Sequence, residues 1–223
     1  MEQGFRANQS QMRTGLPDER LVFVDLETGG REPWRPIFEL AAVAVDANLN
    51  ELETFDVRLK FSRHMADPKV LVGSRYETAS WRRRAICSDD AAEEFAEFLS
   101  RHGTVDQSAS NGRVFQVAQM VAHHAAFDSE FLSQWFNRLG RFLPASRRML
   151  CTMQRAIWLF HEDKSLTPPT DFKLPTLCQY FGIPFPPESA HEALFDVRAT
   201  VSIYREMNKL SIGQRSISKQ RHF

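Results

Sequence analysis

The feature that most constrains the fold is an apolar run that leads into two acidic residues. Residues 21–30 read Leu-Val-Phe-Val-Asp-Leu-Glu-Thr-Gly-Gly, and the β-branched and aromatic residues at the start predict a buried strand that a Thr-Gly-Gly turn ends. Alternate residues of a strand share a face, so the carboxylates of Asp25 and Glu27 should point the same way. Two like charges this close repel each other, and a divalent cation between them is the simplest relief. Taken alone, the segment also fits a strand end with solvated acids.

Two later segments carry acids that complement this pair. Residues 120–128 form a second apolar strand pattern, which ends in two histidines and in Asp128 at the start of a helix pattern. Residues 191–196 begin a long helical pattern and include His191 and Asp196. The three segments together supply four acids and a histidine. Hard cations such as Mg²⁺ and Mn²⁺ prefer carboxylate oxygens, so this set suits them better than it suits a metal that His and Cys bind.

The three segments, in this order, resemble the motifs of the DEDDh family of 3′-5′ exonucleases, relatives of polymerase proofreading subunits and of ribonuclease T. The first family motif, Asp-x-Glu-Thr-x-Gly, is matched at Asp25, Glu27 and Thr28, which glycines at 29 and 30 follow. The second, His-Asn-x-x-Phe-Asp, is matched at residues 123–128 except that His124 replaces the asparagine. The third, His-x-Ala-x-x-Asp, is matched at residues 191–196.

The resemblance implies an α/β domain with a ribonuclease H-like fold, in which helices flank a mixed five-stranded sheet. It implies a metal-dependent enzyme that removes nucleotides from the 3′ end of DNA, RNA or both, with two Mg²⁺ or Mn²⁺ ions. The residues that match the family's metal ligands are Asp25, Glu27, Asp128 and Asp196. The residue that matches its general base is His191.

His191 lies five residues before Asp196, about 500° apart around a regular helix, so the two do not share a helix face. We therefore expect His191 at or before the helix start, on a mobile loop that covers the site. An imidazole with a pKa near its usual value of about 6.5 is suited to take a proton from a water molecule.

The resemblance also implies that backbone near Leu26 to Gly29 receives the 3′-hydroxyl of the terminal sugar. The expected substrate contacts are Leu26, Thr28, Gly29, His124 and Phe127. Tyr76 and Trp81 are further candidates for stacking on terminal bases, although Phe127 fits core packing better. A basic rim is expected among Arg82, Arg83, Arg84, Arg138, Arg141, Arg147, Arg148, Arg215, Lys219 and Arg221.

Charge and cysteine content narrow the class of protein. The formal net charge is zero, which argues against a general nucleic-acid coat protein more than against an enzyme that needs only a local basic rim. The 3 cysteines are scattered and form no CxxC pair, so we expect buried thiols and a reducing cytoplasm. No stretch approaches the ~18 apolar residues of a membrane span, and we expect no membrane partner.

The chain pattern indicates one domain with two tails. We expect a flexible segment at 1–19, the exonuclease domain at 20–210 and a basic tail at 211–223. The predicted strands lie at 21–25, 37–45, 54–61, 114–122 and 149–152, with a loop at 104–113. The predicted helices lie at 89–99, 127–139, 153–161, 174–182 and 191–209.

Two alternatives stay open at this point. A zinc hydrolase built on His123, His124 and His191 lacks a His-x-His or HExxH spacing. A catalytically weak nucleic-acid- or polymerase-binding module predicts the loss of at least one metal acid, and none is missing. The expected partners are single-stranded or frayed 3′ ends, with a polymerase or another repair or processing protein as a further candidate. Residues 58–87 lack the His-Gly-Ile type of segment found in many proofreading subunits, which argues against that group.

Overall fold

The structure is a computed structural model that describes residues 19–72, 76, 79–186 and 192–220, with the backbone alone at 211–220. His191, most of the predicted N-terminal segment and the end of the predicted C-terminal tail lie outside the described residues. Among the described helices, none combines the length and the apolar composition that a membrane crossing needs.

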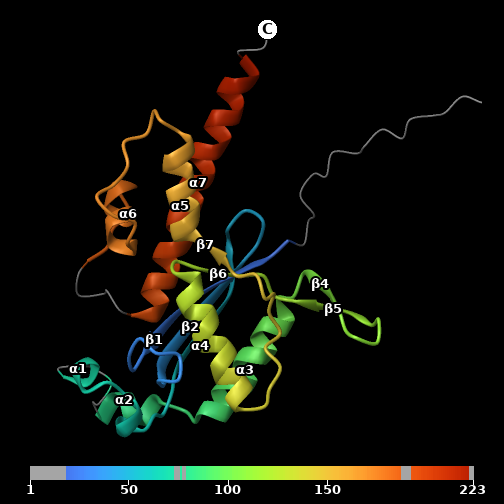
Figure 1. The fold of residues 1–223 in the computed structure, drawn as a ribbon, viewed down its shortest axis with the longest axis vertical. Helices are drawn as coiled ribbons and strands as arrows, with labels where there is room; N and C mark the ends of the chain where they lie inside the picture. Colours follow the sequence, from blue (N-terminus) through green and yellow to red (C-terminus); the bar gives the residue numbers. More distant parts are fainter. Residues whose placement is uncertain (1–18, 73–75, 77–78, 187–191, 221–223) are drawn as a thin grey trace, which may run out of the picture.

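A mixed five-stranded sheet forms the centre of the molecule, with the strand order β3-β2-β1-β6-β7 (Figure 1). β1 (Leu21–Thr28), β2 (Ile37–Val45) and β3 (Glu51–Arg58) form an antiparallel meander. On the other side of β1, β6 (Met120–Ala122) and β7 (Leu150–Cys151) run parallel to it. This arrangement confirms the predicted α/β architecture with its five-stranded sheet.

Different helices cover the two faces of the sheet. α3 (Ser88–Arg101) and α4 (Ala125–Arg138) pack on one face, in a cluster that includes Val22. α7 (Ala193–Gln220) packs on the other face, in a cluster that includes Phe23. Because successive strand residues alternate between faces, the two acids of β1 lie on the same face as Phe23, beneath α7.

Two smaller groups of helices lie at the ends of this core. α5 (Thr152–Glu162) and α6 (Leu174–Tyr180) pack against α7 in an apolar cluster of their own, beyond the sheet (Figure 1). At the opposite end lie η1 (Arg63–Met65), α1 (Pro68–Leu71) and α2 (Ala79–Arg84). Residues of α1 and α2 pack in a cluster around Phe38 at the start of β2.

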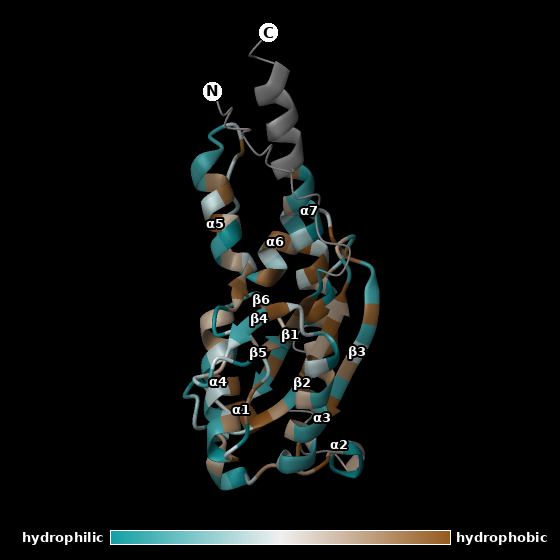
Figure 2. Ribbon diagram, turned by 90° about the vertical axis from the view of Figure 1, so that its right-hand side faces the viewer, coloured by the Kyte–Doolittle hydropathy of each residue, from teal (hydrophilic) through white to brown (hydrophobic). Residues whose placement is uncertain are grey.

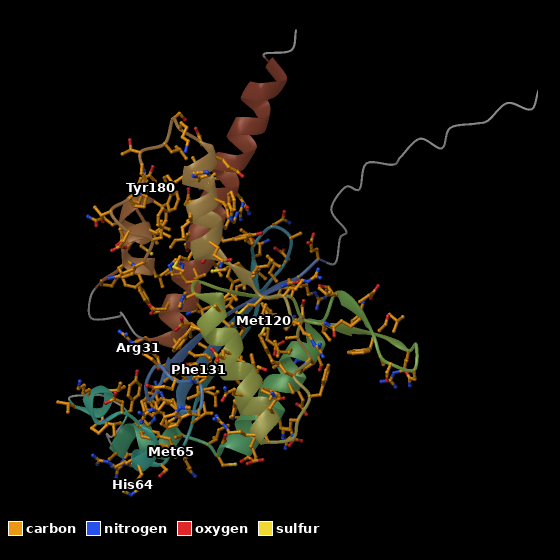
Figure 3. The ribbon with its side chains drawn as sticks, in the orientation of Figure 1. Arg31, His64, Met65, Met120, Phe131 and Tyr180 are labelled. Carbon is orange, nitrogen blue, oxygen red and sulfur yellow. The ribbon has the colours of Figure 1, made fainter. Side chains whose placement is uncertain are left out.

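The distribution of apolar residues follows this layering. Every residue of β2 is buried, since the strand has a neighbour on each edge and helices on each face. Figure 2 shows the central strands largely brown, and the helices alternating between teal and brown. In Figure 3, Phe131 lies on α4 over the sheet, whereas His64 and Met65 lie at the end that carries η1. Phe131 is 1% exposed and Met65 is 45% exposed, in line with these positions.

One predicted strand divides into two. The sequence pattern predicts a loop at 104–113 and a single strand at 114–122, but β4 (Val105–Ser108) and β5 (Val114–Val117) form a separate antiparallel hairpin. The division falls at Ala118, whose backbone bonds to the segment that precedes β7 instead of continuing the hairpin. The remaining residues then join the main sheet as β6.

Other boundaries shift by a few residues. β3 ends at Arg58, earlier than predicted, because the next backbone N–H groups bond to the start of β2 and to Ile86. α4 begins at Ala125, two positions early, which places Asp128 inside its first turn. α7 continues to Gln220, past its predicted end at Lys209.

Candidate metal centre

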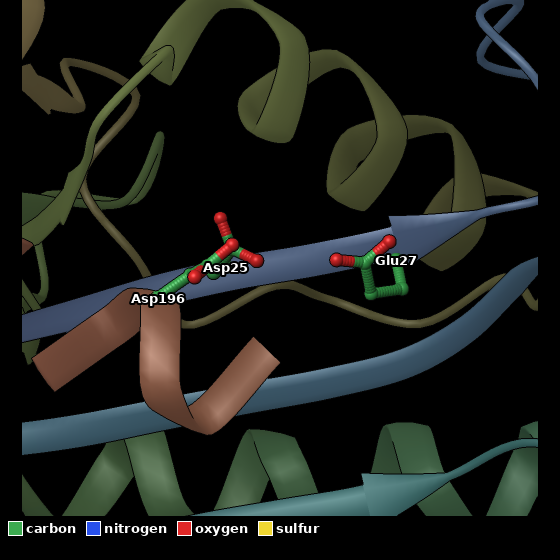
Figure 4. A group of neighbouring side chains, drawn as sticks. All are labelled: Asp25, Glu27 and Asp196. Carbon is green, nitrogen blue, oxygen red and sulfur yellow. The ribbon is translucent and has the colours of Figure 1, made fainter. Parts of the chain in front are cut away.

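Three carboxylates from two elements converge at the second half of β1. Asp25 and Glu27 lie on the face of β1 that α7 covers, and Asp196 lies in the first turn of α7. One ligand oxygen from each side chain lies within 4.8 Å of the others, and Figure 4 shows the three side chains close together. This spacing and this all-oxygen donor set fit a hard divalent cation. Three of the four predicted metal ligands are therefore together.

The fourth predicted ligand, Asp128, lies beside this group without belonging to it. The pairing of β1 with β6 covers Val22 and Phe23, so the later residues of β1 have an open edge. The first turn of α4 lies along that edge, and the carboxylate of Asp128 accepts a hydrogen bond from the backbone N–H of Leu26. The negative charge of Asp128 raises the pKa of Asp25, which marks the two carboxylates as neighbours.

Burial and mutual repulsion change the acidity of both aspartates. The pKa of Asp25 is raised well above its usual value, first by burial and then by the charges of Asp128, Glu27 and Asp196. Burial raises the pKa of Asp128 to about 7, against the lowering effect of its backbone hydrogen bonds. Crowded carboxylates that retain protons release them when a cation binds, because the cation favours their charged forms. The electrostatics of the cluster therefore fit a cation site.

Tyr76 forms a hydrogen bond with the carboxylate of Glu27. Its hydroxyl donates a hydrogen bond to Oε2 of Glu27 at 3.1 Å. Its ring packs on Phe38 and on Trp81, with ring centroids 4.6 Å and 4.9 Å away. Tyr76 and Trp81 are only 8% and 3% exposed, so the predicted stacking of these rings on substrate bases is wrong for this conformation. Their rings are already covered by protein.

A further acid, Glu39, lies at the site and escaped the sequence analysis. It is the residue of β2 directly opposite Glu27, and it is 3% exposed. Its charge is one of those that raise the pKa of Asp25. The signal in the sequence was a single acid within the otherwise apolar segment 37–45.

The two histidines of the second motif have different surroundings. His123 is buried, with Nδ1 2.9 Å from the Thr152 hydroxyl and Nε2 2.9 Å from the Phe172 carbonyl. Burial lowers its pKa, which favours the neutral ring. Because both ring nitrogens are engaged, the zinc-hydrolase alternative loses one of its ligands. His124 is exposed and stacks on half-buried Phe127, with ring centroids 6.2 Å apart, so both remain predicted substrate contacts.

The predicted substrate contacts on and just after β1 also pack in the core or form hydrogen bonds within the protein. The side chain of Leu26 is buried in the core, and the Thr28 hydroxyl donates to the Gly30 carbonyl at 2.7 Å. The Gly29 N–H donates to the Pro36 carbonyl. Contact of these residues with a terminal sugar stays a prediction.

The predicted basic rim is only partly available on the described surface. Arg82, Arg83 and Arg84 are exposed in the last turn of α2. Arg138 donates to the Trp34 carbonyl at 3.0 Å, and Arg141 pairs with Glu93 at 3.1 Å. Those two side chains therefore stabilise the protein surface in this conformation. The side chains of Arg215, Lys219 and Arg221 lie outside the described residues.

Comparison with known proteins identifies the family. The model of the family described as "RNase_T: Exonuclease" matches residues 22–204, which is most of the chain. The chain belongs to this exonuclease family. The match confirms the resemblance that the three motifs carry, while no curated protein sequence matches significantly.

Solved structures of exonuclease I share the fold of this exonuclease-family chain. The zinc-bound Escherichia coli exonuclease I complex with single-stranded DNA has a TM-score of 0.65 and 21% identity over 84% of this chain. The "ExoI/SSB-Ct complex" has a TM-score of 0.61 and 20% identity over 83% of it. Exonuclease I from Methylocaldum szegediense has a TM-score of 0.62 and 20% identity over 83% of it. The matches confirm the ribonuclease H-like fold, and they span only 40%, 40% and 39% of those longer chains.

Proposed function

We propose that this chain is a divalent-cation-dependent 3′-5′ exonuclease that hydrolyses phosphodiester bonds. The observation that carries the proposal is the convergence of Asp25, Glu27 and Asp196 within 4.8 Å, in a chain of the exonuclease family. A fold kept only for binding has no need of three crowded carboxylates, whose mutual repulsion opposes folding. This favours an enzyme over the catalytically weak binding module.

Each residue of the site has a proposed role. Asp25, Glu27 and Asp196 would hold one Mg²⁺ or Mn²⁺ ion, and Asp128 would hold a second ion together with Asp25. Such ions, when bound, supply the activation of water and the stabilisation of the leaving oxygen. His191 would accept the proton of the attacking water at a ring nitrogen. Backbone from Leu26 to Gly29 would orient the terminal 3′-hydroxyl, so that only a chain end enters.

The substrate we propose is the 3′ end of single-stranded or frayed DNA, with RNA as a second possibility to be tested. The E. coli neighbour is a complex with single-stranded DNA, and another neighbour is a complex with SSB-Ct. A single-strand-binding protein is accordingly a proposed partner, and a polymerase, which the motif resemblance implies, is a further one. His124 and Phe127, stacked at the start of α4, are the proposed contacts for a terminal nucleotide.

The test is degradation of 5′-labelled DNA and RNA oligonucleotides with Mg²⁺, Mn²⁺ or chelator. The expected result is a ladder that shortens from the 3′ end, is abolished by chelator, and falls at least about 100-fold in Asp25→Ala and His191→Ala. Asp56→Ala, an exposed aspartate of β3, and His64→Ala, an exposed histidine, are matched controls that should keep full activity. Full activity in chelator or in Asp25→Ala would disprove the mechanism. A ladder that shortens from the 5′ end would disprove the polarity.

A further inference from the structure

A row of charged residues crosses three strands beside the metal centre. Glu27 on β1 is directly opposite Glu39 on β2, and Glu39 is directly opposite Arg58 on β3. Directly opposed residues of antiparallel strands share a face, and their Cβ atoms lie about 5 Å apart. The row therefore places the buried carboxylate of Glu39 between Glu27, a proposed metal ligand, and the positively charged side chain of Arg58.

Arg58 compensates the charge of Glu39 on the side away from the metal centre. Its Nε lies 3.9 Å from Oε1 of Glu39, and the side chain of Glu39 is only 5% exposed. The guanidinium also lies over the ring of Trp81, with 4.7 Å between Cζ and the ring centroid. Contact with the ring restricts where the guanidinium can move, so the positive charge stays beside Glu39.

Trp81 is also connected to the metal centre, through Tyr76. Trp81 packs edge-on against Tyr76, with an interplanar angle of 80°, and the Tyr76 hydroxyl donates to Glu27. The contacts thus form a closed circuit that runs through Glu27, Tyr76, Trp81, Arg58 and Glu39. Within it, Glu27 has a hydroxyl donor on one side and a like charge on the other.

Like charges directly opposite each other in a sheet destabilise it. The Glu27–Glu39 pair therefore lowers the stability of the folded chain. Its repulsion can, however, help to position Glu27 in the cation site. Repulsion from Glu39 disfavours conformations in which the carboxylate of Glu27 lies toward β2. It favours conformations in which that carboxylate faces Asp25 and Asp196. The hydrogen bond from Tyr76 engages Oε2 of Glu27 and fixes that side of the carboxylate.

We propose that Glu39, paired with Arg58, is a positioning residue of the cation site: it directs Glu27 toward Asp25 and Asp196 and adds negative charge behind them, without binding the cation. This inference rests on the proposed function, because it assigns the outer layer of the same site. Outer-layer partners of metal ligands affect affinity for the metal, so the effect appears in cation binding.

The experiment measures Mn²⁺ binding to the full chain by titration calorimetry, with Glu39→Gln as the test variant. The expected result is a rise of about 10-fold in the Kd for Mn²⁺, with kcat at saturating Mn²⁺ within about three-fold of native. The matched control is Glu53→Gln, which removes an acid of β3 that pairs with Arg101 and His102 away from the carboxylates. The control should leave the Kd within about two-fold of native.

Because Glu39→Gln leaves Arg58 without its carboxylate, the double variant Glu39→Gln/Arg58→Gln separates the two effects. Its Kd for Mn²⁺ should stay above native, since the charge nearer to Glu27 is still missing. Recovery of native affinity in the double variant, or native affinity in Glu39→Gln, would overturn the inference and leave the exonuclease proposal intact. A native chain that neither binds Mn²⁺ nor shortens oligonucleotides would overturn both.

Discussion

At the scale of single residues, Gly29 has the least room for a side chain among the described glycines. Its N–H donates to the Pro36 carbonyl at 2.7 Å, and its carbonyl accepts from the Asp67 N–H at 2.6 Å. A Cβ at this position would lie 2.9 Å from Cγ of Pro36 and 3.0 Å from both Cβ of Ala66 and Cζ of Phe38. Close packing thus joins the end of β1, just after the acids, to the segment before α1.

Gly29→Ala should lower the free energy of unfolding by about 1–3 kcal/mol, because the added methyl group overpacks this contact. Urea denaturation of the metal-free protein measures the change. Ser110→Ala, at an exposed position in the loop between β4 and β5, should stay within about 0.5 kcal/mol of native. A Gly29→Ala protein as stable as Ser110→Ala would show that the neighbouring side chains give way without cost.

The predictability of the site differs from residue to residue. Asp25 and Glu27 were found because the period of a strand places alternate residues on one face. Asp196 was found through its motif. Tyr76 could not be assigned to Glu27, since the two are 49 positions apart and their contact depends on tertiary packing. Glu39 was visible as an acid in an apolar strand, but only the register of β1 with β2 places it beside Glu27.

At the scale of elements, His123 joins three segments around the second motif. It follows β6, its Nδ1 lies 2.9 Å from the hydroxyl of Thr152 at the start of α5, and its Nε2 lies 2.9 Å from the Phe172 carbonyl before α6. Burial lowers the pKa of His123, so protonation of the ring opposes folding. Its contribution is present above its usual pKa of 6.5 and is lost as the pH falls below it.

Thr152→Val should lower the free energy of unfolding by about 1–3 kcal/mol, because it leaves a buried ring nitrogen without its hydroxyl partner. Thermal or urea unfolding at pH 7.5 measures this loss. Thr54→Val is the control: it removes a threonine hydroxyl that bonds to Glu51 on the exposed surface of β3, and it should cost less than about 1 kcal/mol. Equal effects of the two substitutions would contradict the linking role of His123.

Local pattern predicts most elements but not where a strand changes partner. The strand at 37–45 has the predicted bounds, because its residues are continuously apolar. The segment 114–122 is also largely apolar, yet it divides at Ala118 between the hairpin and the main sheet. The division depends on hydrogen bonds with the segment before β7, and a window of sequence around residue 118 contains no trace of that partner.

At the scale of the whole molecule, the buried acids link folding to pH and to cations. The pKa of Asp25 and that of Asp128 are both raised in the folded chain, the latter from 3.8 to about 7. The metal-free folded protein therefore binds more protons than the unfolded chain between these values. The resulting stability is fully present below pH about 4 and is lost as the pH rises through the folded pKa values. A bound cation favours the charged carboxylates and offsets this loss.

The metal-free chain should consequently lose stability as the pH rises from 6.5 through about 7, the raised pKa of Asp128, by up to about 1.4 kcal/mol per pH unit for each extra proton held. This range lies above the usual pKa of His123, so that residue does not oppose the trend. Urea denaturation with chelator measures the slope, which saturating Mn²⁺ should flatten. Asp128→Asn should reduce the metal-free slope because it removes one titrating group, whereas Asp56→Asn, on the exposed surface of β3, should retain it. Stability that stays constant or rises with pH over this range in chelator would contradict the prediction, because it would show that the folded chain holds no extra protons there.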